Sequence, residues 1–272
     1  MSFFICPICK KPFTEQNRSL VCPNGHCYDV ARQGYVNLLR AGSARRHGDD
    51  RRMVASRTAF LDAGFYQPLR DAVTGLVLRR ARQGDTVLDA GCGEGYYTSH
   101  IRKALADAGL SVSVYGIDVS RDAILACAAR DRALGLAVAS ISAIPAADTC
   151  VDILVNLFAP FDAAEFARVM KADGTLIRVF PDRRHLYELK EAVYETPYEN
   201  EITTLELDGF SLISEQRLSF PLRLEDGEHI QSLFQMTPYY YKTSREGQER
   251  LARLRSLSAT AEFLLIEYRK SN

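Results

Sequence analysis

Hydrophobic and polar positions along this chain predict strands that alternate with helices from residue 86 onward. Short apolar runs predict strands, whereas segments with apolar residues every three or four positions predict helices. The predicted strands are the run beginning at Thr86, 111–119, 136–145, 151–160, 174–181, 210–222 and 259–270. The predicted helices are the run beginning at Tyr96, 122–131, 163–173 and 183–195. This alternation indicates an α/β fold with a seven-stranded, mostly parallel sheet and helices on both faces.

Two further helices are predicted ahead of the first strand, within residues 57–81. Helical periodicity runs through this stretch and breaks at Ala63 and Gly64. Pro68 opens the second helix, because proline fits the first turn, where its missing N–H is not needed. Tyr66 lies in the break between the two helices.

The turn after the first strand carries three glycines in the sequence TVLDAGCGEGYY. Gly91, Gly93 and Gly95 lack Cβ atoms where the backbone must turn sharply and let a ligand approach. Their G-x-G-x-G spacing differs from the G-x-G-x-x-G that cradles a dinucleotide pyrophosphate. Asp89 and Glu94 flank the glycines, and such carboxylates repel phosphate but suit a ligand that carries an ammonium and a sulfonium. The D-x-G-x-G-x-G pattern therefore resembles motif I of the S-adenosylmethionine (AdoMet)-dependent methyltransferases.

Polar groups at the ends of later strands extend this site, because ligands of parallel sheets bind at the carboxyl ends of the strands. Asp118 ends the second strand, 23 residues after Gly95, where its carboxylate can accept both ribose hydroxyls of a nucleoside. The alternative is that Asp118 caps the following helix together with Ser120. The sequence NLFAP ends the fourth strand, where a substrate base would meet the methyl group. Asn156 in this sequence is a candidate for orienting the edge of that base.

Four of the seven cysteines fall within the first 27 residues, and three of them form a metal-ligand pattern with a histidine. The pattern Cys6-x2-Cys9-x12-Cys22-x3-His26 contains two close pairs, which suit one tetrahedral zinc ion. Four protein ligands leave no open coordination position, so a zinc ion here would be structural. Cys27 is an alternative fourth ligand. Apolar residues between the two pairs predict a small β-hairpin.

Composition limits the class of protein. The chain has 272 residues, 47% hydrophobic and 25% charged, which suits one large domain and one small one. No apolar run approaches the ~18–20 residues of a membrane span, and the first residues lack the features of a secretory signal. We therefore expect a cytoplasmic protein without a membrane partner, in which reduced thiols favour a metal site over disulfides.

Charge is unevenly distributed, although the 34 basic and 34 acidic residues balance overall. Residues 1–57 hold ten basic and four acidic residues, a net charge of +6. Segment 40–57 has many arginines and few apolar residues, which predicts contacts with nucleic-acid phosphates. A solvated surface is the alternative interpretation. The arginines predicted to bind RNA are Arg40, Arg45, Arg46, Arg51 and Arg52.

Taken together, these segments resemble one known family. The sequences CPIC…CPNGH, ARQGYVNLL, FLDAGFYQPL, LDAGCGEGYYT, LFAP and RHLYELK occur here in the order typical of the RlmA-type 23S rRNA (guanine-N1)-methyltransferases. The resemblance covers roughly residues 4–240. It implies a Rossmann-like class I methyltransferase fold with an N-terminal zinc module, and methylation of N1 of one guanine in a 23S rRNA hairpin. Some members of the family are linked to macrolide resistance, and its two branches modify different guanines.

The resemblance also implies specific ligands. It implies zinc on Cys6, Cys9, Cys22 and His26. It implies AdoMet contacts from Tyr66, Gly93, Glu94 and His185. The glycine motif and the strand end add Asp89, Gly91, Gly95 and Asp118 to the expected AdoMet-binding residues. The assignment of His185 rests on the resemblance, since a single histidine is more often structural. A homodimer that forms a two-armed cleft for RNA would fit these expectations.

We expect three parts: a zinc-binding RNA-recognition module at 1–40, a basic linker with helices at 41–82, and an AdoMet-dependent methyltransferase domain at 83–272. One alternative is an AdoMet enzyme for a small molecule or a protein, which would stay active without residues 1–40. A second is a non-enzymatic RNA-binding protein, which the intact glycine motif disfavours. A third is a nicotinamide-dependent oxidoreductase, which the glycine spacing disfavours.

Overall fold

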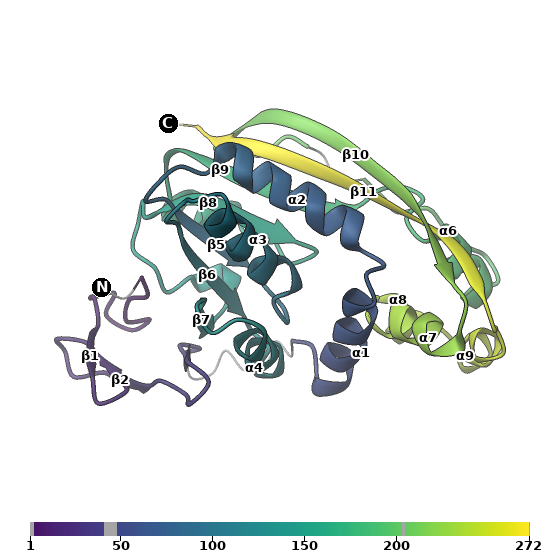
Figure 1. Cartoon of the computed structure of the whole chain (residues 1–272), viewed down its shortest axis with the longest axis horizontal. Coiled ribbons are helices and arrows are strands. Elements are labelled where there is room, and N and C mark those ends of the chain that lie inside the picture. The colour runs from purple at the N-terminus through teal and green to yellow at the C-terminus, as the bar shows by residue number, and fades with distance from the viewer. Residues whose placement is uncertain (1–2, 41–47, 203–204, 272) are drawn as a thin grey trace.

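A computed structural model describes residues 3–40, 48–202 and 205–271. Within these residues, the centre of the protein is an eight-stranded sheet with the order β10-β11-β9-β8-β5-β6-β7-β4 (Figure 1). All neighbours from β4 to β9 are parallel, whereas β11 is antiparallel to β9 and to β10. The strands are β4 (Tyr35–Asn37), β5 (Thr86–Ala90), β6 (Ser113–Asp118), β7 (Gly135–Val138), β8 (Val151–Leu157), β9 (Met170–Pro181), β10 (Phe210–Leu224) and β11 (Leu257–Lys270).

The prediction of a mostly parallel sheet is confirmed, but the predicted count of seven strands is one too low. Each of the seven predicted strands is present. The additional strand, β4, has only three residues and pairs in parallel with β7, about a hundred residues further along the chain. A strand this short has little periodicity of its own, and its partner is distant in sequence, so the local pattern did not predict it.

Helices cover both faces of the sheet because buried residues alternate between its two sides. Val87 packs with α2, α3 and α4, which lie together on one face (Figure 1), whereas the next residue, Leu88, packs with α5 on the other. The helices are α1 (Arg51–Asp62), α2 (Gln67–Arg80), α3 (Tyr96–Asp107), α4 (Arg121–Arg130), α5 (Ala163–Val169), α6 (Tyr187–Val193), α7 (Gly227–Gln235), α8 (Tyr239–Lys242), α9 (Arg245–Ala252) and the 3-10 helix η1 (Ile141–Ala143). In the part of the chain that the structure describes, no helix is both long and apolar enough to cross a membrane.

The N-terminal module is attached to the edge of the large sheet. Its own antiparallel sheet contains β1 (Thr14–Gln16), β2 (Ser19–Val21) and β3 (Cys27–Asp29), and the β1–β2 pair confirms the predicted hairpin. Besides the β4–β7 pair, Phe4 bridges to Ala146, and the ring of Phe3 stacks on Tyr115 at 4.2 Å. The module therefore shares hydrogen bonds and apolar contacts with the large sheet.

Strands β10 and β11 form a long antiparallel ribbon that extends beyond the other strands (Figure 1). Helices α7, α8 and α9 lie between these two strands in sequence and gather at the far end of the ribbon. Helix α1 packs against α7, so this end of the ribbon lies next to the helix that contains the end of the basic segment. The carboxyl ends of the parallel strands and this helical group enclose the cavity described next.

Candidate cofactor site and metal centre

A cavity of about 1250 Å³ opens at the carboxyl ends of β5, β6 and β8. Its inner wall is the glycine loop, and its outer wall comes from α1, the segment after α6, and α8. Of the residues predicted to bind AdoMet, the structure brings Tyr66, Asp89, Gly91, Gly93, Glu94, Asp118 and His185 to its lining. Gly95 does not line the cavity; it turns the chain into α3 behind it.

Two of the predicted glycines are required by the geometry of the loop. Gly91 has a φ of +98°, and a Cβ added to it would lie 2.3 Å from the Cβ of Ala159. Gly95, at a φ of +82°, caps α3, and its added Cβ would lie 2.4 Å from the sulfur of Cys127. A side chain at either position would meet both backbone strain and a clash. The glycine loop therefore packs directly against the loop that follows β8.

Asp118 is held by the glycine loop. Its Oδ2 accepts the backbone N–H of Gly93 at 3.0 Å, and its Oδ1 accepts the N–H of Ser120 at 2.8 Å. Ser120 itself caps α4 through its hydroxyl, so the helix has a cap that does not depend on Asp118. Because Asp118 also lines the cavity at the end of β6, this geometry is consistent with the predicted ribose contact.

The cavity wall is acidic and poorly neutralised. Asp89 accepts the Thr98 hydroxyl at 2.5 Å through Oδ2, while its Oδ1 has no hydrogen-bond partner among the described residues. Burial raises the pKa of Asp89 to about 7; the Thr98 hydroxyl opposes this rise, and the charges of Asp118 and Glu94 add to it. Burial also raises the pKa of Glu94 and of Asp118. Ionising these three carboxylates is costly because they lie away from water. A cationic ligand would stabilise their charged forms, so the cavity favours such a ligand.

Two arginines that were not predicted as cofactor residues complete this part of the site. Arg57 of α1 lines the cavity and pairs with Asp49. Nη2 of Arg130 lies 3.8 Å from Oε1 of Glu94, and its Nε donates to the Glu94 carbonyl. Both guanidinium groups lower the pKa of Glu94 against the larger effect of burial. In the sequence Arg57 belongs to the basic segment 40–57, and no local pattern distinguishes an arginine that faces inward.

Tyr66 and His185 form a buried pair that also lines the cavity. Oη of Tyr66 lies 3.4 Å from Nε2 of His185, and Nδ1 of His185 accepts the backbone N–H of Glu262 at 3.1 Å. Burial lowers the pKa of His185 to about 3, so the ring is neutral at physiological pH. Since Nδ1 is the acceptor, Nε2 carries the proton and points toward Tyr66. This pair offers neutral polar groups and an aromatic face.

These residues fit AdoMet by the chemistry of their donor and acceptor groups. Oδ1 of Asp89 and Oε1 of Glu94 are buried and lack hydrogen-bond partners within the described residues. Such acceptors match a ligand with an ammonium, hydroxyls and a sulfonium, whereas they would repel a pyrophosphate. The acidic glycine loop thus distinguishes this cavity from a dinucleotide site.

Asn156 does not line the cavity. Its Nδ2 donates to the carbonyl of Ala90 at 2.9 Å and to the carbonyl of Pro160 at 3.1 Å. Both amide hydrogens are therefore used to tie the loop after β8 to the end of β5. This geometry gives Asn156 the task of fixing the loop, with both amide hydrogens donated within the protein.

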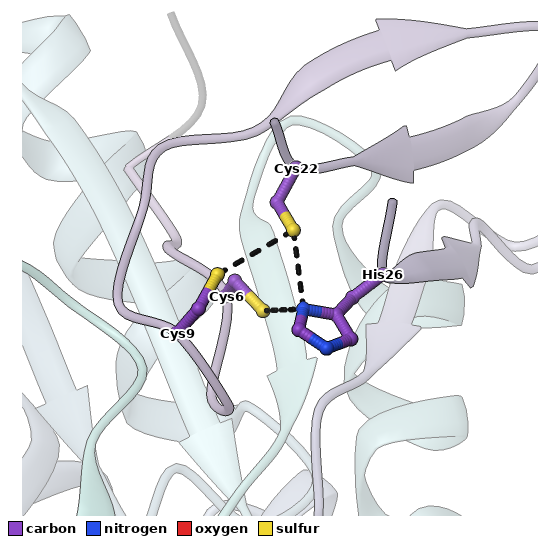
Figure 2. Close-up of side chains that lie close together, drawn as sticks. All are labelled: Cys6, Cys9, Cys22 and His26. Atoms are coloured by element: carbon purple, nitrogen blue, oxygen red, sulfur yellow. Dashed lines mark hydrogen bonds between the residues drawn. The ribbon is translucent and has the colours of Figure 1, made fainter. Parts of the chain in front are cut away.

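Cys6, Cys9, Cys22 and His26 form a second site, in the N-terminal module (Figure 2). Their candidate ligand atoms lie within 4.8 Å of one another. Nδ1 of His26 lies 3.5 Å from the sulfur of Cys6 and 3.3 Å from that of Cys22, and the sulfurs of Cys9 and Cys22 are 3.5 Å apart. A tetrahedral zinc site with bonds of about 2.3 Å has ligand separations of about 3.8 Å. The donor set and its spacing fit zinc.

Cys27, the alternative ligand, is exposed and lies outside this cluster, so among the described residues the cluster is Cys3His. Burial raises the pKa of Cys22, but hydrogen bonds from Cys9 and from backbone N–H groups outweigh it and lower the pKa to about 6. A thiol that ionises this readily is a good metal ligand, because the thiolate is the form that binds. All four positions are protein ligands, which makes this zinc structural.

The arginines predicted to bind RNA are only partly described. Arg45 and Arg46 lie outside the described residues. Arg51 and Arg52 are exposed in the first turn of α1, and Arg40 is exposed after β4. Because Met53 and Arg57 of the same helix line the cavity, α1 connects the basic segment to the cofactor site.

The fold and the acidic glycine loop define a class I AdoMet-dependent methyltransferase that carries a structural zinc module. Comparison with known proteins agrees with this class. Residues 4–44 match a family model described as the N-terminal zinc ribbon of RlmA, and residues 81–236 match a methyltransferase domain model. A solved complex pairs the Haloferax volcanii Trm112 methyltransferase activator with a protein provisionally named as a methyltransferase. One chain of this complex superposes with a TM-score of 0.52 at 18% identity, covering 83% of this chain and 100% of that one. That likeness concerns the fold alone.

Two relatives identify the family. The 23S rRNA (guanine(748)-N(1))-methyltransferase of Streptomyces fradiae is 35% identical over 228 residues, which cover 81% of this chain and 79% of the relative. YxjB of Bacillus subtilis, provisionally named as a 23S rRNA (guanine-N1)-methyltransferase, is 32% identical over 96% of this chain and 95% of its own. The chain belongs to the RlmA-type family of 23S rRNA (guanine-N1)-methyltransferases.

Proposed function

We propose that this protein transfers the methyl group of AdoMet to N1 of one guanine in 23S rRNA. The main support for this proposal is that the zinc module and the AdoMet cavity are built on the same sheet. A Cys3His module of the RlmA type pairs through β4 with the sheet whose other strands hold an acidic AdoMet cavity. The name of the Streptomyces fradiae relative makes guanine 748 the first candidate for the modified base.

Bound AdoMet would supply a methyl group that its sulfonium already activates. The protein's own work is then orientation and the exclusion of water. We assign ammonium and ribose contacts to the carboxylates Asp89, Glu94 and Asp118, and a neutral polar contact to the Tyr66–His185 pair. Asp89, Glu94 and the Tyr66–His185 pair are buried, and Asp118 is held by two backbone N–H groups. Little reorganisation is therefore needed when the methyl group moves.

We further propose that the zinc module and the basic segment hold the RNA. Arg40, Arg45, Arg46, Arg51 and Arg52 would contact phosphates of a hairpin, while the target base leaves its stack to reach the cavity. In this scheme residues 1–40 recognise RNA, 41–82 link, and 83–272 carry out the transfer in the cytoplasm. A homodimer would give the RNA a two-armed cleft.

The test of the reaction is direct. The purified protein is incubated with AdoMet and with 23S rRNA from a strain that lacks its own enzyme, and digested RNA is analysed by mass spectrometry for 1-methylguanosine. We expect one modified guanine with the wild-type protein and none with Asp118→Asn. If the RNA stays unmodified while AdoMet still binds, the substrate is a small molecule or a protein instead.

The RNA-binding role of the arginines is tested by the dependence of binding on salt. Changing Arg51 and Arg52 to alanine together should reduce the slope of log K against log [salt] by about 0.7–0.9 for each phosphate that the two side chains neutralise. AdoMet affinity should not change. Arg245→Ala is the matched control, because Arg245 is 92% exposed on α9, at the far end of the molecule from the module. An unchanged slope in the double variant would remove these two arginines from the RNA surface.

Truncation is a poor test of the alternative substrates. Deleting residues 1–40 would remove β4 from the sheet and the contacts of Phe3 and Phe4 with its edge. Loss of activity could then come from unfolding. The full-length protein assayed in parallel with rRNA and with candidate small-molecule acceptors separates the two functions without this complication.

A further inference from the structure

Exposed aromatic rings gather in the cavity. Among the described residues six large hydrophobic side chains are strongly exposed, and three of them, Phe158, Tyr198 and Tyr241, line this one cavity. Concentration of exposed apolar surface in a hollow marks a binding site. The volume of about 1250 Å³ also exceeds the roughly 300–1,000 Å³ of a typical small-ligand pocket. The cavity therefore has room for a second ligand with an aromatic face beside AdoMet.

Phe158 is the exposed ring whose own loop packs against the glycine loop. It directly follows β8, and its backbone N–H donates to the carbonyl of Val179 at 3.1 Å. The next residue, Ala159, packs tightly against Gly91, because a Cβ added to Gly91 would lie 2.3 Å from the Cβ of Ala159. A ring at position 158 thus belongs to a loop that packs against the cofactor wall. Tyr198 and Tyr241 come from the segment after α6 and from α8, on the outer wall.

The backbone holds Phe158 in a conformation that its side chain disfavours. Its φ is +55°, in the left-handed region that bulky residues rarely adopt. The Asn156 amide, bonded to the carbonyls of Ala90 and Pro160, fixes the loop on both sides of it. Strained residues of this kind persist where the surrounding structure holds them, and they cluster at functional sites.

The ring nevertheless stays open to the cavity. Phe158 is 45% exposed, although its ring centroid lies 5.5 Å from that of Phe263 and 6.5 Å from that of Tyr97. These two tilted ring contacts hold Phe158 in place, while nearly half of the residue stays exposed and available for contact. A supported aromatic ring beside a methyl donor is a platform for a planar, uncharged ligand.

We infer that Phe158 is the platform on which the target guanine stacks after leaving the RNA helix, with its N1 edge toward the methyl group. This inference rests on the proposed function, and it adds the residue that positions the base. Enzymes that act on an extruded base hold it by stacking on aromatic side chains. Stacking needs a π-face and does not need a polar group, which matches an unsubstituted phenyl ring on this wall.

The test compares four variants in the rRNA methylation assay, with AdoMet affinity measured separately by calorimetry. Phe158→Ala and Phe158→Gly should lower kcat/KM for rRNA by about 5- to 150-fold, the loss of one base–aromatic stack. Phe158→Tyr should stay within about threefold of wild type because it keeps the ring, whereas Phe158→Leu should not. AdoMet affinity should be unchanged in all four. Leu212→Ala, at a residue 51% exposed on β10 outside the cavity, is the control.

Phe158→Gly also separates function from folding. Glycine adopts a φ of +55° without strain, so this variant should unfold at the same temperature as wild type or higher, while losing methylation. Wild-type kcat/KM in the alanine and glycine variants would overturn the platform, as would a loss of AdoMet binding in them. Failure of the proposed function looks different, because the wild-type protein itself would then leave rRNA unmethylated.

Discussion

Gly91→Ala should destabilise the protein strongly, and the size of the effect follows from two separate terms. The residue has a φ of +98°, where an alanine costs about 1–2 kcal/mol of backbone strain. Its new Cβ would lie 2.3 Å from the Cβ of Ala159, and relieving such overpacking costs typically about 1–3 kcal/mol. Together the loss is about 2–5 kcal/mol of unfolding free energy, measured by urea unfolding followed by circular dichroism.

A matched glycine isolates the steric term. Gly84 has a φ of +86°, and an added Cβ there would meet nothing within 4 Å, so Gly84→Ala should lose only the strain, about 1–2 kcal/mol. The double variant Gly91→Ala with Ala159→Gly removes the clash, and a double-mutant cycle should return about 1–3 kcal/mol of coupling. If Gly91→Ala costs no more than Gly84→Ala, the two loops do not touch as the structure describes.

Three further predictions concern protonation and metal. Burial lowers the pKa of His185 to about 3. Between pH 6.5 and 3 the unfolded chain therefore binds a proton at this residue that the folded protein does not bind. The free energy of unfolding should decrease as the pH falls through this window. Urea unfolding of His185→Gln, which lacks this group, should show a shallower decline than wild type, by up to about 1.4 kcal/mol per pH unit. The pKa of Asp89 is about 7, so AdoMet affinity should weaken by up to about tenfold per pH unit as the pH falls below 7. Asp89→Asn should bind AdoMet weakly at every pH, without this dependence. Calorimetry measures both affinities. Cys9→Ser or zinc chelation should make the N-terminal module sensitive to limited proteolysis. Cys27→Ser should keep the protease resistance of wild type and a zinc content of one ion per chain, because Cys27 lies outside the cluster.

The sequence by itself determined features that depend on neighbouring residues. The ligand spacing of Cys6, Cys9, Cys22 and His26 predicted the zinc cluster, because each pair is built by one tight turn. The glycine loop was likewise predictable, since a strand, a turn that needs positive φ, and a helix follow one another directly. The alternating strands and helices indicated the fold class for the same local reason.

Other features were decided only by the tertiary structure, because they depend on partners that are distant in the chain. The eighth strand exists because β4 finds β7. Arg57 lines the cavity because α1 packs beside it. The amide of Asn156 donates to Ala90 at the end of β5 and to Pro160 in the loop after β8. Phe158 stays exposed because its loop is held in place. Ala159 packs against Gly91, and the backbone N–H of Phe158 donates to the carbonyl of Val179. Sequence patterns report periodicity and turn chemistry, whereas packing between distant segments determines which side chains face the ligand.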